Sequence, residues 1–371
     1  MSDRSELDLR IEIAEGKPPR DLRKRVERHL AAGELVALPT ETVYGIAARA
    51  DSPEALERLR ALKGRDAARA LSWHVASREV VERFDELRPL ARRLAARYWP
   101  GPLTLVLHGV PEGLEGLASD GWLGVRLPAN LTTQGVIEGL DFAVCLSSAN
   151  KSGGQPCTSG PAVEQLFGDD LALVVDGGPS RLGESSGVLK LGRGQFELLR
   201  EGLLPIEDLR RIAGLRLGFC CTGNTCRSPM AEGLALRLIA ERLGVAGPRE
   251  RQAVAEFGFE ISSFGTFASP GARASSYTLD VLAQRDIALS EHASTPATPE
   301  LVRELDQVYC LTRSHLDALK AMLPPGRAKK LALLDPDGRD IADPIGGSLA
   351  VYEQCGDAIL RALEAHASDW A

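Results

Sequence analysis

The sequence contains no apolar stretch close to the roughly 20 residues that a membrane-spanning helix needs. Its first residues, Met1 to Glu6, are polar and acidic, whereas a secretion signal has an apolar centre. These two absences predict a cytoplasmic protein that neither crosses nor binds a membrane.

The chain also has no excess of basic charge and no paired metal ligands. It has 44 Lys and Arg and 51 Asp and Glu. The resulting net charge of −7 argues against a broadly basic surface for nucleic acid, although not against a local basic patch. The six histidines show no zinc-ligand spacing, so no metal site is predicted. The seven cysteines are odd in number and crowd at Cys220, Cys221 and Cys226, which favours a reduced compartment over a disulfide framework.

A length of 371 residues is too great for one ordinary core and predicts two domains. In the first part, helices are expected at 22–32, 53–62 and 87–98, with strands at 34–39, 103–107, 142–146, 171–175 and 187–191. Glycine and proline near 201–214 place the boundary between domains 1–213 and 214–371. In the second part, strands and helices alternate up to a closing helix at 349–367, which predicts an α/β fold with a parallel sheet.

The segment 221–229, Cys-Thr-Gly-Asn-Thr-Cys-Arg-Ser-Pro, lies between a predicted strand and a predicted helix. Gly223 and Asn224 tolerate left-handed backbone angles, so the loop can curl with its N–H groups inward and bind a dianion at the helix start. Arg227 can hold two phosphoryl oxygens, Ser228 can donate to a Cys221 thiolate, and nearby donors lower a thiol pKa. This pattern predicts phosphoryl transfer to cysteine.

A leaving group in such a reaction needs a proton, and Asp343, followed by Pro344 in a Gly-rich loop, is the obvious acid. A lone cysteine at a strand end is more often a small buried residue, and a lone Asp-Pro is more often a turn. Arg227, Ser228 and the Gly-Asn pair at fixed offsets favour a catalytic role for Cys221, and the presence of this loop favours one for Asp343.

In the first part, a hydroxyl-rich segment at 39–45 follows a strand, and basic residues follow at Lys63, Arg65 and Arg69. Basic groups at such spacings can hold a triphosphate, and the polar segment 147–154 suits small-molecule hydrogen bonds. Each feature alone is more often a solvated charge or a turn. No Walker or dinucleotide-binding loop is present. The residues by themselves indicate a nucleotide-binding α/β domain and no specific reaction.

Residues 215–371 closely resemble the low-molecular-weight protein-tyrosine phosphatases. The likeness lies in segments 221–232, 268–271, 287–292, 311–315 and 343–348. The resemblance implies a three-layer α/β domain with a parallel sheet and no cofactor, acting on phosphoproteins through a phosphocysteine intermediate. It implies Cys221 as nucleophile, Arg227 as phosphate ligand, Ser228 as thiolate donor and Asp343 as general acid. The phosphate loop would comprise Thr222, Gly223, Asn224, Thr225 and Cys226.

Three positions bear on the substrate of this domain. Tyrosine-specific members typically have aromatic residues after the Asp-Pro pair, where this chain has Ile345 and Gly346. Thr225 matches the protein-arginine phosphatase branch, although those enzymes usually have an aromatic at the Ile345 position. We therefore expect phosphoarginine to be favoured, with phosphotyrosine next.

Other cysteines bear on two further ideas about the same domain. Arsenate reduction is less favoured because Cys310 and Cys355 are expected in a strand and a helix rather than in a relay. Cys226 is close enough in sequence to Cys221 for a reversible disulfide that protects the nucleophile, which we state as a hypothesis.

Residues 20–210 resemble the YrdC-like threonylcarbamoyl-adenylate synthases in segments 38–45, 62–65, 99–105, 124–126, 148–153 and 175–178. The resemblance implies a twisted α/β sheet domain with a large cavity. It implies that threonine, bicarbonate and ATP, with Mg²⁺, give threonylcarbamoyl-AMP and pyrophosphate for tRNA adenosine-37 modification, with tRNA-modification proteins as partners. The implied threonine-binding residues are Thr42, His74, Arg126, Ser148 and Ser186. The implied ATP-binding residues are Lys63, Arg65, Arg69, Asn150, Thr158 and Arg200.

The sequence departs from this family at Asp66, Ala70, Trp73 and Gly187. The leading interpretation is a bifunctional enzyme. The alternative is a phosphatase whose first domain is a non-catalytic nucleotide- or RNA-binding module. A carbamoyl transferase is a third interpretation, but the zinc-finger cysteines of such proteins are missing.

Overall fold

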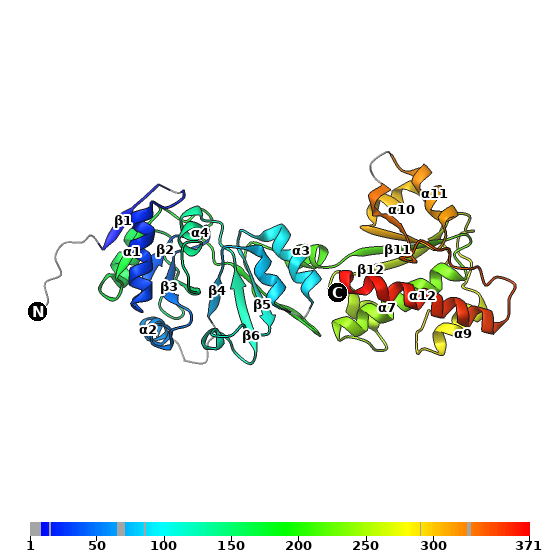
Figure 1. The fold of residues 1–371 in the computed structure, drawn as a ribbon, viewed down its shortest axis with the longest axis horizontal. Coiled ribbons are helices and arrows are strands. Elements are labelled where there is room, and N and C mark those ends of the chain that lie inside the picture. Colours follow the sequence, from blue (N-terminus) through cyan, green and yellow to red (C-terminus); the bar gives the residue numbers. More distant parts are fainter. Residues whose placement is uncertain (1–8, 15, 65–70, 85–86, 290, 325–327) are drawn as a thin grey trace, which may run out of the picture. The chain divides into compact units, whose positions relative to one another are not determined.

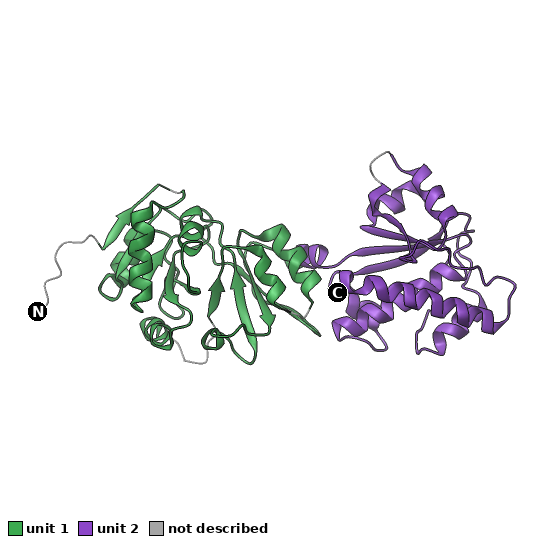
Figure 2. Ribbon diagram, viewed as in Figure 1, with its two compact units in different colours: residues 1–206 green, residues 207–371 purple. Residues whose placement is uncertain are grey.

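The structure is a computed structural model, and it describes residues 9–14, 16–64, 71–84, 87–289, 291–324 and 328–371. The chain divides into two compact units, Met1–Ile206 and Glu207–Ala371 (Figure 2). None of the helices in these described ranges is long and apolar enough to cross a membrane.

The division falls after Ile206, the first residue of helix α6 (Ile206–Ala213), whereas the sequence predicted a boundary after this helix, at 213. Arg210 of α6 donates through Nε to the carbonyl oxygen of Glu256 at 3.0 Å. This hydrogen bond connects the helix to the second unit.

The first unit contains a ten-stranded mixed sheet in the order β1-β8-β2-β3-β7-β4-β6-β5-β9-β10 (Figure 1). Its strands are β1 (Arg10–Glu12), β2 (Val36–Leu38), β3 (Gly45–Arg49), β4 (Ser72–His74), β5 (Leu103–His108), β6 (Trp122–Arg126), β7 (Val144–Ser148), β8 (Leu173–Asp176), β9 (Gly187–Gly192) and β10 (Gln195–Arg200). Strand β2 pairs parallel with β8 and antiparallel with β3, so both kinds of pairing meet inside one sheet.

The helices of the first unit are α1 (Arg20–Ala31), α2 (Pro53–Lys63), α3 (Arg88–Tyr98), α4 (Leu131–Ile137) and α5 (Gly160–Phe167). Helix α1 buries Leu22, Val26 and Leu30, which recur every four residues and therefore form one face. This face joins a core with side chains of β2, β7 and β8. Ser52 caps the start of helix α2, where its side chain accepts from Ala55 N, and Gly64 caps the end in a left-handed conformation.

The second unit contains a four-stranded sheet in the order β12-β11-β13-β14, and all its pairings are parallel. Its strands are β11 (Arg216–Cys221), β12 (Glu260–Gly265), β13 (Gln307–Cys310) and β14 (Leu331–Leu333). Its helices after α6 are α7 (Arg227–Leu243), α8 (Glu250–Ala255), α9 (Ser276–Ala283), α10 (Pro299–Glu304), α11 (Arg313–Met322) and α12 (Leu349–Trp370). Helices α7 and α12 lie on one face of the sheet, and α10 and α11 on the other (Figure 1).

The predicted α/β class is confirmed for both units, with a large mixed sheet in one and a parallel sheet between helices in the other. Strand β11 is central in the second sheet and leads directly to the phosphate loop. The loop therefore lies at the carboxyl end of a central parallel strand, where α/β folds usually bind ligands.

Candidate active sites

The phosphate loop fills the five residues between strand β11 and helix α7. Asn224 has φ of 54°, a left-handed backbone conformation. This conformation lets the loop curl as the sequence predicted. Gly265, at the end of β12, lies so close that a Cβ there would come within 2.3 Å of the Thr222 carbonyl oxygen. The loop is thus held against the backbone of the neighbouring strand.

Cys221 is surrounded by hydrogen-bond donors. Its sulfur lies 2.9 Å from Ser228 Oγ and accepts from Asn224 N at 3.3 Å. Asn224 Nδ2 donates to Ser228 Oγ at 2.9 Å, which leaves the Ser228 proton for Cys221 Sγ or for the Phe264 carbonyl oxygen at 3.3 Å. This arrangement suits a hydroxyl that donates to a Cys221 thiolate.

The side chain of Asn224 is fixed on several sides. Its Nδ2 also donates to Ser263 Oγ at 2.8 Å, and its Oδ1 accepts from Thr295 N at 2.7 Å. Its carbonyl oxygen lies 2.8 Å from His292 Nε2. Ser263 and Thr295 were not identified as part of the site from the sequence, because a lone serine or threonine far from the loop carries no recognisable signal.

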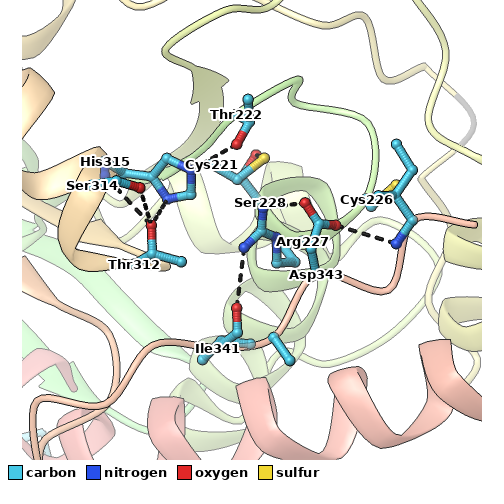
Figure 3. Close-up of polar contacts among 12 residues, drawn as sticks. Cys221, Thr222, Cys226, Arg227, Ser228, Thr312, Ser314, His315, Ile341 and Asp343 are labelled. Carbon is cyan, nitrogen blue, oxygen red and sulfur yellow. Dashed lines mark hydrogen bonds and ion pairs between the residues drawn. The ribbon is translucent and has the colours of Figure 1, made fainter.

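Arg227 and Asp343 meet in the second unit although they are far apart in sequence (Figure 3). Arg227 Nη2 lies 2.5 Å from Asp343 Oδ2, and its Nη1 donates to the Ile341 carbonyl oxygen at 3.1 Å. The Arg227 Nε is buried and has no hydrogen-bond partner within the part of the chain that the structure describes. The Asp343 side chain is 40% exposed, so it can face both the arginine and a leaving group.

His315 connects the loop to helix α11. Its Nε2 lies 2.9 Å from Thr222 Oγ1, and its Nδ1 lies 2.8 Å from Thr312 Oγ1 (Figure 3). Burial, with the nearby positive charge of Arg227, lowers the pKa of His315 to about 4. The ring is therefore neutral at physiological pH and positions Thr222 without adding charge beside the loop.

All seven cysteines are free thiols. Cys226 Sγ lies 3.3 Å from Tyr352 Oη and 3.7 Å from Ser275 Oγ. Cys310 lies in β13 and Cys355 in α12, as the sequence indicated. Burial raises the pKa of the Cys355 thiol to about 12, which suppresses thiolate formation.

The first unit contains a cavity of about 400 Å³, and five of the predicted site residues line it. These five are His74, Arg126, Ser148, Ser186 and Arg200. They come from strands β4, β6, β7 and β10 and from the segment before β9, so the mixed sheet brings together side chains from distant parts of the sequence. Further lining residues include Thr40, Tyr44, Thr104, Trp122 and Lys190.

Arg126 is held by a buried carboxylate that the sequence did not reveal as a site residue. Its Nη2 lies 2.6 Å from Glu41 Oε1 and 2.8 Å from Thr42 Oγ1. Glu41 Oε2 accepts from Ala129 N at 2.8 Å. Predicted residue Thr42 thus contacts Arg126 and is not among the residues that line the cavity.

His74 is neutral in this cavity. Burial and the nearby charge of Arg126 lower its pKa to about 3, and its Nδ1 lies 3.0 Å from the Ser72 carbonyl oxygen. The cavity lining also has a hydroxyl pair, in which Ser186 Oγ lies 3.0 Å from Thr104 Oγ1 and accepts from Arg200 Nη2 at 2.9 Å.

Lys63 and Asn150, predicted to bind ATP, both contact Ser148, predicted to bind threonine. The buried Lys63 Nζ donates to the Ser148 carbonyl oxygen and lies 3.5 Å from Ser148 Oγ, which donates to Asn150 Oδ1 at 2.6 Å. Thr158 is elsewhere: its carbonyl oxygen accepts from Ser180 N at 2.7 Å, and it does not line the cavity. Arg65 and Arg69, with the departures Asp66 and Ala70, lie outside the described residues.

Tyr44 is a further residue whose contribution the sequence did not show. Its hydroxyl lies 2.9 Å from Asp176 Oδ1, and burial together with Asp176 raises its pKa. The hydroxyl-rich segment and the Asp-Gly-Gly segment were both visible in the sequence, but their contact across the sheet was not.

Comparison with known families matches both parts of the chain. The Sua5–YciO–YrdC family model, described as telomere recombination, matches residues 28–202. The low molecular weight phosphotyrosine protein phosphatase model matches residues 216–369.

Two relatives by sequence agree with these assignments. The threonylcarbamoyl-AMP synthase of Pyrococcus abyssi is 36% identical over 247 residues, which are 62% of this chain and 72% of that protein. The protein-arginine-phosphatase of Bacillus subtilis is 36% identical over 148 residues, which are 39% of this chain and 89% of that protein. A solved structure of a Sua5 variant from P. abyssi aligns with a TM-score of 0.49 and 28% identity over 69% of this chain and 91% of that one.

Proposed function

The chain belongs to both the threonylcarbamoyl-AMP synthase family and the low-molecular-weight phosphatase family, and we propose that it is a bifunctional enzyme with one active site in each unit. The observation that supports this proposal best is that each unit gathers its own polar site. The first encloses Arg126, His74 and Ser148 in a cavity, and the second surrounds Cys221 with donors.

In the first unit, threonine, bicarbonate and ATP are the proposed substrates. Arg126, held by Glu41, is proposed to bind the threonine carboxylate, because its guanidinium lines the cavity and carries positive charge. Lys63 and Arg200 supply positive charge for the ATP phosphates. Mg²⁺ is proposed to enter with ATP as its complex.

The proposed reaction depends mainly on holding the reactants together. The threonine amine attacks CO2, formed by dehydration of bicarbonate, and gives a carbamate. A carbamate oxygen then attacks the α-phosphorus of ATP and breaks its bond to the β-phosphate, releasing pyrophosphate. Neutral His74 can hold the substrate by hydrogen bonds without taking up a proton, and the cationic side chains stabilise the departing charge.

Release of pyrophosphate tests this proposal and distinguishes it from a non-catalytic binding module. We expect release only when threonine, bicarbonate and ATP are all present, and loss of release in Arg126→Ala. Binding of ATP with no pyrophosphate at high protein concentration would favour the non-catalytic module and contradict the proposal.

In the second unit, the proposed reaction is hydrolysis of a phosphorylated protein. The Cys221 thiolate attacks phosphorus while Arg227 and the loop N–H groups bind the phosphoryl oxygens. Asp343 protonates the leaving group as its bond to phosphorus breaks. Water then hydrolyses the phosphocysteine and restores the thiolate.

The proposed preference is for phosphoarginine. It is supported by Thr225, whereas Ile345 stands where both the tyrosine and the arginine enzymes usually have an aromatic and so favours neither substrate. The named arginine phosphatase relative adds support. The test compares phosphoarginine and phosphotyrosine peptides of one sequence, and we expect faster phosphoarginine hydrolysis and a shift towards phosphotyrosine in Thr225→Ile. Faster phosphotyrosine hydrolysis by the unmutated protein would contradict this preference.

A further inference from the structure

The cavity of the first unit contains a cationic side chain that the sequence did not identify as a site residue. Lys190 and Trp122 both line this cavity, and Lys190 Nζ lies 4.1 Å from the centroid of the Trp122 ring. The negative face of an aromatic ring attracts a cation at such a distance. The pair therefore holds a positive charge inside the cavity.

The position of Lys190 on strand β9 directs its side chain into the cavity. Successive residues of a strand point to opposite faces of the sheet. Ser186 and Val188 line the cavity together with Lys190, whereas the alternate residues Leu189 and Leu191 are completely buried. The direction of the Lys190 side chain is thus set by the same strand that presents Ser186.

The register of the sheet places Lys190 at the end of a row of cavity residues. Val106 of β5 pairs with Lys190 on one side and with Gly124 of β6 on the other. Gly124 pairs in turn with Ser72 of β4, and Ser72 pairs with Leu146 of β7. All five residues line the cavity, so the row crosses its floor over five strands.

This row separates two ends of the cavity. Arg126 and His74, which pair with each other, lie on one side of it, at the proposed threonine end. Trp122 and Ser148 lie on the other side, each two residues beyond the row on its own strand. Ser148 accepts from Lys63 through its carbonyl oxygen. Because the Lys190 ammonium lies over Trp122, it points to the end where Lys63 supplies charge for the phosphates.

The Lys190 ammonium is available to a ligand. Among the residues that the structure describes, its contact is the Trp122 ring, and no oxygen atom accepts from it. Arg126, by contrast, is ion-paired with Glu41, and Arg200 donates to Ser186. An ammonium carries three N–H donors, so an anion in the cavity can accept from Lys190 without breaking a hydrogen bond within the protein.

We propose that Lys190 binds the terminal phosphates of ATP and that Trp122 holds its ammonium in position for them. This proposal rests on the proposed synthase activity and adds a cation to those that the family resemblance implies. Lysine binds phosphate oxygens as a point charge. As the carbamate oxygen bonds to the α-phosphorus, the bond to the β-phosphate breaks and its electron pair passes to pyrophosphate. Lys190 stabilises this charge as pyrophosphate departs.

The position of Lys190 favours the phosphates over bicarbonate, the other anionic substrate. Bicarbonate has to meet the threonine amine, and the threonine carboxylate is proposed to lie on Arg126. Lys190 Nζ points away from Arg126, towards Trp122. A triphosphate also carries several negative charges, so it gains more from an additional cation than a monoanion does.

The first test compares substrate dependence in the full-length protein and in Lys190→Met, which keeps the apolar stem and removes the charge. We expect the KM for ATP, and the Kd for ATP measured by calorimetry, to rise about tenfold. The KM values for threonine and bicarbonate should stay within about twofold. Lys190→Arg should retain most of the ATP affinity because it keeps the charge. Lys24→Met, at an exposed position on α1, is the matched control and should change none of these values.

The second test follows the fluorescence of Trp122. Binding of the phosphates draws the ammonium away from the ring, so we expect ATP to change the tryptophan emission of the unmutated protein. This change should be absent in Trp122→Phe and in Lys190→Met at ATP concentrations that saturate each variant. A purely structural role for Lys190 does not predict this dependence.

Unchanged KM and Kd for ATP in Lys190→Met would overturn the proposal. A rise in the KM for bicarbonate alone would assign Lys190 to bicarbonate and overturn it as well. A different result is ATP binding that depends on Lys190, without pyrophosphate release by the unmutated protein. It would contradict the proposed synthase and support the role of Lys190 in binding the phosphates.

Discussion

The Arg227 guanidinium and the Asp343 carboxylate lie 2.5 Å apart, with Nη2 next to Oδ2. The residue that would bind the phosphoryl group is thus paired with the residue that would protonate the leaving group. We expect a phosphoryl dianion to compete for the same guanidinium and to release Asp343 to face the leaving group. The pair would then couple substrate binding to positioning of the acid.

Replacing Asp343 with Asn should lower kcat by about 10²- to 10⁴-fold for a peptide substrate, because the leaving group then departs without a proton. The loss should be much smaller for p-nitrophenyl phosphate, whose leaving group is a stable anion. Steady-state kinetics with both substrates measure the difference. Equal losses for the two substrates would contradict the role of Asp343 as general acid.

Replacing Glu41 with Gln should weaken threonine binding, because Glu41 orients Arg126 in the cavity and the two side chains are 4% and 7% exposed. Removing one partner of a buried ion pair also costs about 3–5 kcal/mol of stability. We expect the KM for threonine to rise more than the KM for ATP, and the unfolding midpoint in urea to fall. Glu82→Gln, which breaks the more exposed pair with Arg92, is the matched control and should change neither. An unchanged KM for threonine in Glu41→Gln would exclude the positioning role.

Acid should destabilise the protein through its buried neutral histidines. Burial lowers the pKa of His315 to about 4, whereas an unfolded histidine titrates near 6.5. Between these values the unfolded state binds more protons, so the free energy of unfolding decreases as pH falls from about 6.5 to about 4. His315→Asn should remove up to about 1.4 kcal/mol per pH unit from this slope. Urea unfolding at several pH values between 4 and 6.5 measures how the free energy of unfolding changes with pH. The same pH dependence in the variant and in the unmutated protein would contradict the prediction.

Cys226→Ser should make peroxide inactivation of the phosphatase less reversible, if Cys226 protects Cys221 by forming a disulfide with it. The measurement is the phosphatase activity recovered with dithiothreitol after timed exposure to peroxide. Cys355→Ser, which changes a buried thiol on α12, is the control and should recover as the unmutated protein does. Full recovery of phosphatase activity in Cys226→Ser would contradict the hypothesis.

The fold class could be predicted because local patterns carry it. Strand β11, the loop and helix α7 follow one another in the chain, so the surroundings of Cys221 are mostly local and could be read from nine residues. The unit boundary was less accessible, because the hydrogen bond that connects Arg210 of α6 to the second unit involves Glu256, which is 46 residues away in sequence.

Contacts between residues that are distant in sequence could not be predicted from the sequence. Glu41 lies in the loop between β2 and β3, whereas Arg126 ends β6, and no spacing rule connects the two. Phe267 reads as an ordinary loop residue, and only the backbone hydrogen bonds to Cys221 and Thr222 in its segment place it at the phosphate loop.

The most direct test of two active sites in one chain is to assay pyrophosphate release and phosphopeptide hydrolysis on the same full-length preparations. The account predicts that Cys221→Ser abolishes phosphopeptide hydrolysis and leaves threonine-dependent pyrophosphate release intact, and that Arg126→Ala does the reverse. Loss of both activities in either folded variant, or no threonine-dependent release by the unmutated protein, would contradict it.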